Sequence, residues 1–201
     1  MHLIFKHTKN NNKKEEKGLS LIESAMVLAL AATVTAGVMF YYQSASDSNK
    51  TQSAISEVMS ATSAINGLYI GQSSYDGLTP QVLVNSSAIP DNYKDSTNSK
   101  IRNPFGGDLE VGPKNGGSGF GYHITLTNLP KSACVSLATL NLGTSAAGYG
   151  ININNAASST LNGSGSSGNS GSSFMKTNAI SPSDASTQCN TATNKVTYFM
   201  K

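Results

Sequence analysis

One carboxylate and two cysteines are the residues of this 201-residue chain whose type and position say most about its chemistry. Glu23 is the single charged residue in an apolar run of 24 residues between Leu19 and Tyr42. A charged side chain within lipid is costly, so it usually has a partner and a role. Cys134 and Cys189, the only two cysteines, both follow this run. They predict a disulfide formed in an oxidising compartment, worth about 4 kcal/mol for a loop of this length.

The apolar run is the element that must position Glu23. As a helix, 24 residues would extend about 36 Å, which is enough to cross a hydrocarbon layer of about 30 Å. Lys13, Lys14 and Lys17 precede the run, and this places that side in the cytoplasm. The run is too long for a secretory signal peptide. A plain membrane anchor is the alternative that hydropathy alone leaves open.

The charges of the chain are divided unevenly. Residues 1–18 hold five lysines and two glutamates, a net of +3, whereas residues 19–201 hold nine basic and nine acidic residues, a net of zero. A neutral protein lacks the long-range repulsion that keeps copies apart. Nucleic-acid binding needs a surplus of positive charge, so nucleic acid is not expected as a partner.

The helical pattern continues beyond Tyr42 with apolar residues on one face, and we expect one helix over about 19–70. The apolar positions recur at steps of three and four residues: Ile55, Val58, Met59, Thr62, Ile65 and Tyr69. The first half of this helix, 19–42, would lie in the membrane. The second half would be covered by a globular head.

The head, residues 71–201, reads as alternating short strands and helices. Strands are predicted at 81–84, 108–111, 122–127, 149–153 and 195–200, and helices at 130–142 and from Ser181 onward. In the strand 122–127, Tyr122, Ile124 and Leu126 would face inward, and His123 would lie outward in solvent. A single sheet packed on the long helix gives an α+β fold.

The residues around Glu23 also carry a family resemblance. The segment 17–23, with the sequence Lys-Gly-Leu-Ser-Leu-Ile-Glu, resembles the class III signal of type IV pilins. The resemblance implies that a membrane-embedded aspartyl peptidase cuts between Gly18 and Leu19 and methylates the new amino group of Leu19. It also implies that Glu23 pairs with the amino terminus of a neighbouring subunit.

Other parts of the chain narrow the resemblance to one branch of that family. The long leader and a first mature residue other than Phe resemble type IVb pilins. Five further segments resemble type IVb pilins of the bundle-forming type: 44–50, 64–71, 103–107, 133–143 and 195–201.

This resemblance predicts the organisation of the chain. The expected parts are a leader (1–18), a long helix (19–70) and a head (71–201), arranged as the type IV pilin ladle with a mainly antiparallel sheet and one disulfide. The chain would be the major subunit of a self-assembling filament on a Gram-negative bacterium. It would be held in the inner membrane before assembly and would lie in an extracellular fimbrium afterwards. The implied partners are copies of itself, the prepilin peptidase, the assembly machinery and a host cell surface, with roles in adherence and autoaggregation.

Three alternatives stay open at this point. A minor pilin or a type II secretion pseudopilin would share the leader chemistry, and a membrane-anchored binding protein would not polymerise. An enzyme has no support, because the sequence shows no nucleophile constellation, no Walker motif and no cluster of metal-ligand residues. Gly163, Gly165 and Gly168 spell GxGxxG in a low-complexity stretch, but no helix pattern follows, so no nucleotide site, cofactor or metal is expected.

Overall fold

The computed structural model describes residues 20–87, 89–95, 97–115, 119–161 and 174–201. The predicted leader 1–18 lies outside these ranges, and so do Leu19 and the low-complexity stretch 162–173. The chain divides into two compact units, Met1–Gln43 and Ser44–Lys201. The helices, including short 3-10 turns labelled η, are α1 (Leu21–Leu68), α2 (Pro80–Val84), η1 (Asp91–Tyr93), α3 (Lys131–Ala138), η2 (Gly143–Ser145) and α4 (Pro182–Gln188). The strands are β1 (Lys94–Asp95), β2 (Lys100–Arg102), β3 (Asp108–Pro113), β4 (Tyr122–Leu129), β5 (Ala146–Ile151), β6 (Phe174–Lys176) and β7 (Asn194–Met200).

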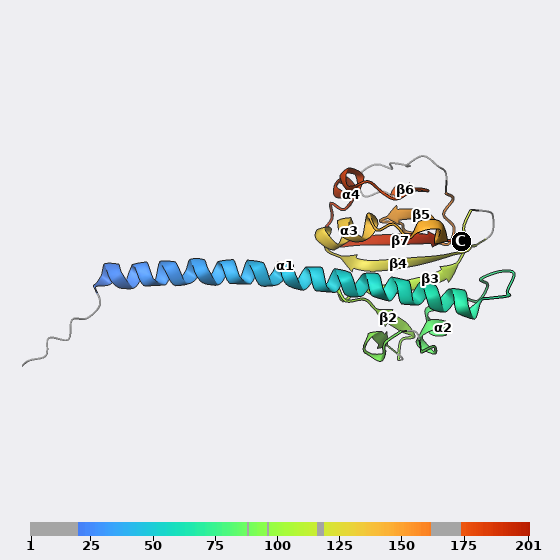
Figure 1. Ribbon diagram of the computed structural model, residues 1–201, viewed down its shortest axis with the longest axis horizontal. Coiled ribbons are helices and arrows are strands. Elements are labelled where there is room, and N and C mark those ends of the chain that lie inside the picture. Colours follow the sequence, from blue (N-terminus) through green and yellow to red (C-terminus); the bar gives the residue numbers. More distant parts are fainter. Residues whose placement is uncertain (1–19, 88, 96, 116–118, 162–173) are drawn as a thin grey trace, which may run out of the picture. The chain divides into compact units, whose positions relative to one another are not determined.

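The strands of the described residues form one sheet in the order β1-β2-β3-β4-β7-β5-β6, with antiparallel pairing throughout. The last strand of the chain, β7, therefore lies between β4 and β5 (Figure 1). Thr125 of β4 and Thr197 of β7 lie opposite each other, and their buried hydroxyls are 2.9 Å apart. Since β4 and β7 share the longest register, these two strands are the centre of the head.

The main core lies on the face of the sheet that carries Tyr122, Ile124 and Leu126, as predicted. Both α3 and the head half of α1 contribute buried side chains to it. Tyr198 of β7 donates a hydrogen bond of 2.8 Å from its hydroxyl to the carbonyl of Leu137, which fixes α3 to the sheet. Burial raises the pKa of Tyr198 well above its usual range.

In α1 the buried stripe differs from the predicted one. The buried residues are Ala54, Glu57, Val58, Ala61 and Ile65, whereas Met59 is exposed. The prediction weighted large apolar side chains. The core of the head instead covers the stripe that carries the two alanines.

Two other predicted elements were wrong in type or length. Residues 81–84 lie in the helix α2, not in a strand, and the adjacent Leu83 and Val84 are both buried, which strand alternation would not allow. The helix predicted at 130–142 ends at Ala138. The chain turns there because the amide of Leu142 donates to the hydroxyl of Tyr149 in β5 at 2.9 Å.

His123 was predicted to be solvated and is half-buried instead. Its ring lies against Gly112 on the neighbouring strand β3, where an added Cβ would come within 2.9 Å of the ring. Burial lowers the pKa of His123 from 6.5 to about 4, so the imidazole is neutral at physiological pH.

Candidate assembly surface and its charged groups

The first half of α1, residues 21–43, carries a long exposed apolar surface. No residue of this part is buried, and large side chains such as Leu21 (85% exposed) and Phe40 (77% exposed) are bare. Among the described helices, α1 is the one long and apolar enough to cross a membrane, judged by length and composition. This surface has to be covered by lipid or by another protein, because monomeric soluble proteins rarely expose apolar patches of this extent.

Three hydroxyl side chains within this apolar segment are satisfied by the helix itself. The hydroxyl of Ser24 donates to the carbonyl of Leu21, that of Thr33 to Leu30, and that of Thr35 to Ala31, at 2.8 to 3.0 Å. No described partner outside the segment is involved in these bonds. These three hydroxyl groups therefore keep a hydrogen-bond partner when the segment enters an apolar environment.

Glu23 lies in the first turn of α1 and is exposed. Its Oε2 accepts a hydrogen bond of 2.9 Å from the backbone amide of Ser20, three residues earlier. This is half of a capping box, in which a Glu at the third helical position satisfies an amide at the helix start. The sequence reasoning did not foresee this cap, although the Ser-x-x-Glu spacing signals it. In the single chain, Glu23 is thus held at the helix terminus with its other oxygen available.

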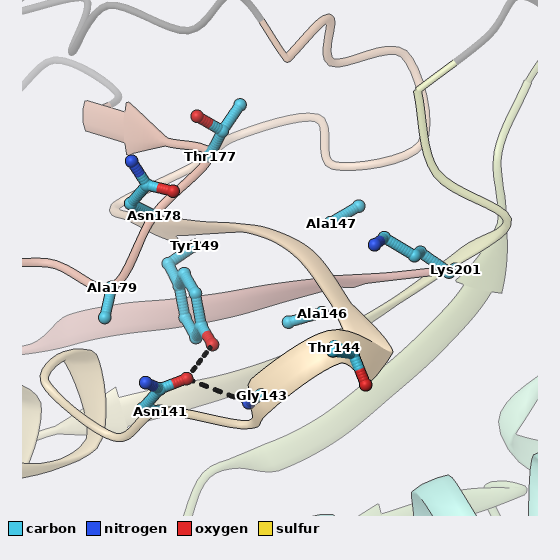
Figure 2. Close-up of a pocket in the computed structure, with 10 residues that line it drawn as sticks. All are labelled: Asn141, Gly143, Thr144, Ala146, Ala147, Tyr149, Thr177, Asn178, Ala179 and Lys201. Atoms are coloured by element: carbon cyan, nitrogen blue, oxygen red, sulfur yellow. Dashed lines mark hydrogen bonds between the residues drawn. The ribbon is translucent and has the colours of Figure 1, made fainter.

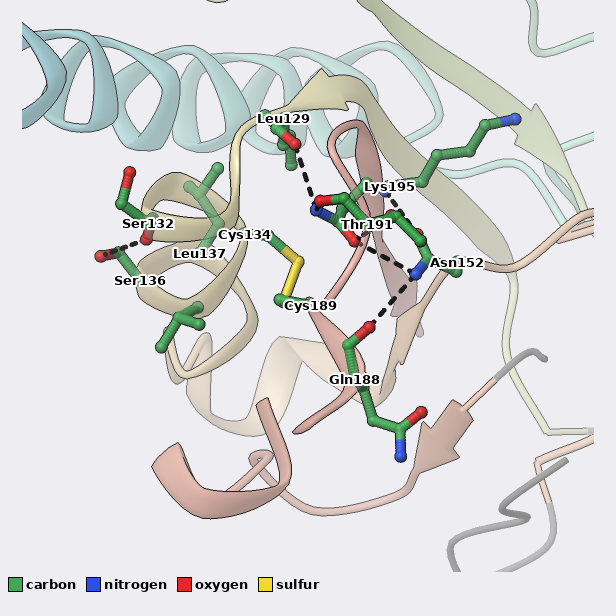
Figure 3. The surroundings of a disulfide bond; sticks show 12 residues. Leu129, Ser132, Cys134, Ser136, Leu137, Asn152, Gln188, Cys189, Thr191 and Lys195 are labelled. Carbon is green, nitrogen blue, oxygen red and sulfur yellow. Dashed lines mark hydrogen bonds between the residues drawn. A yellow bond between two sulfur atoms is a disulfide. The ribbon is translucent and has the colours of Figure 1, made fainter. Parts of the chain in front are cut away.

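The two cysteines meet as predicted. Cys134 of α3 and Cys189, which follows α4, form a disulfide with a Cα–Cα distance of 5.8 Å, and both are buried (Figure 3). Beside the bridge, the side-chain amide of Asn152 donates to the carbonyl of Gln188 at 3.3 Å, and its oxygen accepts from the amide of Lys195 at 2.9 Å. Bridge and amide together fix the turn that leads from α4 into β7.

The helix α4 begins with the predicted cap. Ser181 accepts from the amide of Asp184 at 3.2 Å, and Pro182 is the first helical residue. Asp184 also receives the ammonium of Lys176 at 2.6 Å. The hydrogen bonds from Lys176 and Ser181 lower the pKa of Asp184.

An open depression of about 600 Å³ lies at the other end of the head (Figure 2). Its lining is small or polar: Asn141, Gly143, Thr144, Ala146, Ala147, Tyr149, Thr177, Asn178, Ala179 and Lys201. Within this lining the hydroxyl of Tyr149 donates to Asn141 at 3.3 Å, and Lys201 is the one charged residue. These ten residues offer no acid–base pair or nucleophile with a base, so the depression has no catalytic arrangement.

Glu57 is the residue that the sequence reasoning overlooked. It sits in the buried stripe of α1, is 3% exposed, and neither carboxylate oxygen has a hydrogen-bond partner among the described residues. Burial raises the pKa of Glu57 from 4.5 to about 8. Its position three residues after Ala54 and four before Ala61 was the available signal, because that spacing places all three on one helical face.

Comparisons with known proteins agree with this architecture. The profile of the bundlin family matches residues 43–199. A relative from Escherichia coli O111:H- is 72% identical over 192 residues, covering 94% of this chain and 97% of the relative. A second, from Escherichia coli O127:H6 (strain E2348/69 / EPEC), is 71% identical with the same coverage. Both are described as the major structural subunit of bundle-forming pilus.

A solved structure is similar as well. The crystal structure of type IV b pilin from Salmonella typhi has 21% sequence identity and a TM-score of 0.49, and the match covers 73% of this chain and 98% of that one.

The long helix, the antiparallel sheet and the single disulfide of the described residues define the type IV pilin class of α+β protein, as the sequence predicted. Within that class, the identity to the two relatives over most of the chain is decisive. The chain belongs to the bundlin family.

Proposed function

We propose that this chain is the major structural subunit of a type IVb pilus of the bundle-forming type, which polymerises into an extracellular filament. The observation that carries the proposal is the bare apolar surface of α1 over residues 21–43, in a chain 72% identical to a major pilus subunit. Copies of the same segment cover such a surface once the subunit leaves the membrane. The small residues Ala25, Ala29 and Ala32 allow these helices to approach closely.

The chain reaches this state by processing. A membrane-embedded peptidase removes residues 1–18 by cutting between Gly18 and Leu19, and the same enzyme methylates Leu19. The mature chain then consists of the helix 19–70 and the head 71–201, and 19–42 serves first as membrane anchor and then as filament core. The support for this is the motif at 17–23 and the apolar stretch that directly follows it.

The new amino group gives Glu23 a partner. An α-amino group is mostly cationic at neutral pH. Its charge, brought into an apolar filament core, requires an anion, and Glu23 of an adjacent subunit supplies one. Because both charges are desolvated, this pair sets the axial register of the subunits more than it adds net stability. The free oxygen of Glu23 in the single chain is compatible with this role.

The wider setting follows from the family. The proposed partners are a cytoplasmic ATPase, an inner-membrane platform and an outer-membrane secretin of a Gram-negative bacterium, and the filament would serve autoaggregation and adherence to host cells. The energy for assembly would come from the cytoplasmic ATPase.

Intact-mass analysis of the protein from sheared surface filaments tests the proposal. We expect a chain that starts at Leu19 with one added methyl group and is the most abundant component of the filaments. A full-length chain, or protein found only in the membrane, would reject a pilin role. Low abundance in otherwise normal filaments would indicate a minor subunit.

The variant Gly18→Ala is the matched control for processing. We expect it to accumulate as full-length protein in the membrane, without filaments, because the peptidase cuts after glycine. Normal mature filaments from Gly18→Ala would contradict the assigned cleavage position.

A further inference from the structure

The head contains a carboxylate for which the single chain provides no counterpart. Glu57 is only 3% exposed, and both of its carboxyl oxygens lack a hydrogen-bond partner in the described part of the chain. A buried acid without a partner costs free energy, whether it stays ionised or takes up a proton. A partner from outside that brings a cation or a hydrogen-bond donor to the carboxyl group would remove this cost.

Glu57 lines a small pocket in the head that opens to the surface. The pocket has a volume of about 160 Å³ and is lined by Ser53, Ser56, Glu57, Ser60, Pro90 and Tyr93. Ser56 and Pro90 are exposed and form its rim, whereas Tyr93 is half-buried. The pocket thus lies beside a carboxyl group whose two oxygens are covered in the single chain.

The lining fits an ammonium group. A lysine ammonium has three donors and no acceptor, and it is a compact charge. The lining of the pocket combines the Glu57 carboxyl group with three serines, Ser53, Ser56 and Ser60. A calcium or magnesium ion would need more charged oxygen ligands than this single carboxylate, and the described residues contain no group of three or more metal-ligating side chains.

The charges of the described chain leave lysines available for this role. The ion pairs within the head use Lys94, Lys100, Arg102 and Lys176 with Asp91, Asp95, Asp108 and Asp184. Lys50, Lys131 and Lys201 are exposed, and none of them has a carboxylate within ion-pair distance in the described part of the chain. Residues 19–201 contain equal numbers of basic and acidic residues. A lysine without a partner in its own chain can therefore pair with an acidic residue of another copy.

We propose that the Glu57 pocket binds the ammonium group of an exposed lysine, Lys50, Lys131 or Lys201, of an adjacent copy of this chain. This inference rests on the proposed filament, in which neighbouring heads present their lysines at a high effective concentration. The contact is distinct from the pairing of Glu23, because it joins heads and not stems. It adds a second, separately placed charge contact between copies.

The contact couples assembly to pH. In the single subunit, burial holds the Glu57 carboxyl mostly protonated at neutral pH, since its pKa is about 8 and no nearby charge contributes to the shift. When the ammonium enters, the carboxyl proton leaves to solvent and a carboxylate–ammonium pair remains. By linkage, the contact tightens as pH rises from about 6 to 8, because release of the proton costs less free energy when the proton concentration in solvent is lower.

The first test compares Glu57→Gln with the unaltered mature chain, as filaments and as single subunits in detergent micelles. The amide keeps the shape and removes the charge. We expect Glu57→Gln subunits to fold, and their filaments to dissociate about ten-fold more readily at pH 8, a change equal to about 1.4 kcal/mol. The difference should shrink towards pH 6. The exposed Glu110 provides the matched control Glu110→Gln, which should behave like the unaltered chain.

The second test locates the lysine and does not depend on the stability of Glu57 variants. Ser56→Cys on the rim is combined with Lys50→Cys, Lys131→Cys or Lys201→Cys, and the filaments are oxidised. We expect one combination to give ladders of cross-linked subunits from filaments and none from single subunits in micelles. The native cysteines are already paired with each other.

Two results would overturn the proposal. One is filaments of Glu57→Gln with unchanged dissociation between pH 6 and 8, together with no cross-linked ladder. The other is a partner within the chain: Lys94 is 14% exposed at its side chain and follows Tyr93, so a Glu57 pKa that rises on Lys94→Met in single subunits would assign the pair to Lys94. Absence of filaments from the unaltered chain would instead show that the proposed function itself has failed.

Discussion

The two halves of α1 share one helical conformation but differ in what surrounds them. Residues 21–43 have no buried side chain, and their apolar groups are exposed around the whole circumference. Residues 44–68 bury one stripe in the core of the head. Each half carries one carboxylate in an unusual position: Glu23 caps its own helix, whereas Glu57 is covered and unpartnered among the described residues.

This difference shows how a helix can belong to two different environments. Apolar residues on all sides predict burial from every direction, which only lipid or other copies can supply. Apolar residues on one side need only one packed face, which the head supplies. Changes in the first half should therefore alter assembly without altering the head, and truncation of the buried apolar side chains of the second half should destabilise the head.

The largest effect is expected at the stem carboxylate. Glu23→Gln should be processed and should keep a folded head, but the filament yield should fall at least about ten-fold, because one buried charge loses its counterpart. Electron microscopy and quantification of sheared filaments measure the yield. Unchanged piliation would remove the charge-pairing argument, and Glu110→Gln, on an exposed strand position, is the matched control.

The disulfide should dominate the stability of the head alone. Replacing both cysteines, Cys134→Ser with Cys189→Ser, should lower the free energy of unfolding by about 4 kcal/mol, because the bridge restricts the unfolded chain. Urea unfolding of the mature chain in detergent measures this, and a lower amount of subunit in cells should accompany it. An unchanged unfolding midpoint would show that the polar network around Asn152 is sufficient to fix this turn.

A pair of truncations compares the halves of α1 directly. Ile65→Ala should destabilise the head by about 3 kcal/mol, since a fully buried side chain leaves a cavity. Val34→Ala, at a position 66% exposed in the single chain, should leave the unfolding of the head unchanged and weaken the filament. If Val34→Ala destabilised the head, or Ile65→Ala affected only assembly, the division between the halves would be wrong.

The smallest effect concerns pH and the head. His123 has a folded-state pKa of about 4, below its ordinary 6.5. The unfolded chain therefore binds more protons than the folded chain between these pH values. As a result, the free energy of unfolding is unaffected by His123 above about pH 6.5 and falls as the pH is lowered towards 4. His123→Gln should flatten this acid-side decline relative to the unaltered chain in urea unfolding. An equally steep decline in the variant would assign it to other groups.

The sequence was a good guide wherever a strong local pattern existed. The helix predicted at 19–70 is α1, the strands at 108–111, 122–127 and 195–200 are present within one residue or two of their ends, and Ser181 caps α4. Uninterrupted apolar periodicity, strict alternation and a Ser-Pro start are each interpretable without knowledge of the neighbours. The pairing of two lone cysteines needed no further information either.

The predicted secondary structure was wrong where contacts with residues distant in the sequence determine the local conformation. The segment 81–84 has strand-forming residues, but it became helix α2, whose Leu83 and Val84 both reach the core. The helix α3 stopped early because Tyr149 captures the amide of Leu142. The strands β1, β2 and β6 have two or three residues each and exist through their partners, so no local pattern could predict them.

By itself, the amino-acid sequence determined the long helix, the apolar stem with its single carboxylate, the zero net charge of residues 19–201 and the bridge between the two cysteines. These features follow from the composition of the chain and from the spacing of residues along it. The tertiary structure alone decided which stripe of α1 is buried, where β7 lies in the sheet, and that Glu57 and His123 are covered. Burial depends on which surfaces meet, and residues far apart in the chain bring those surfaces together.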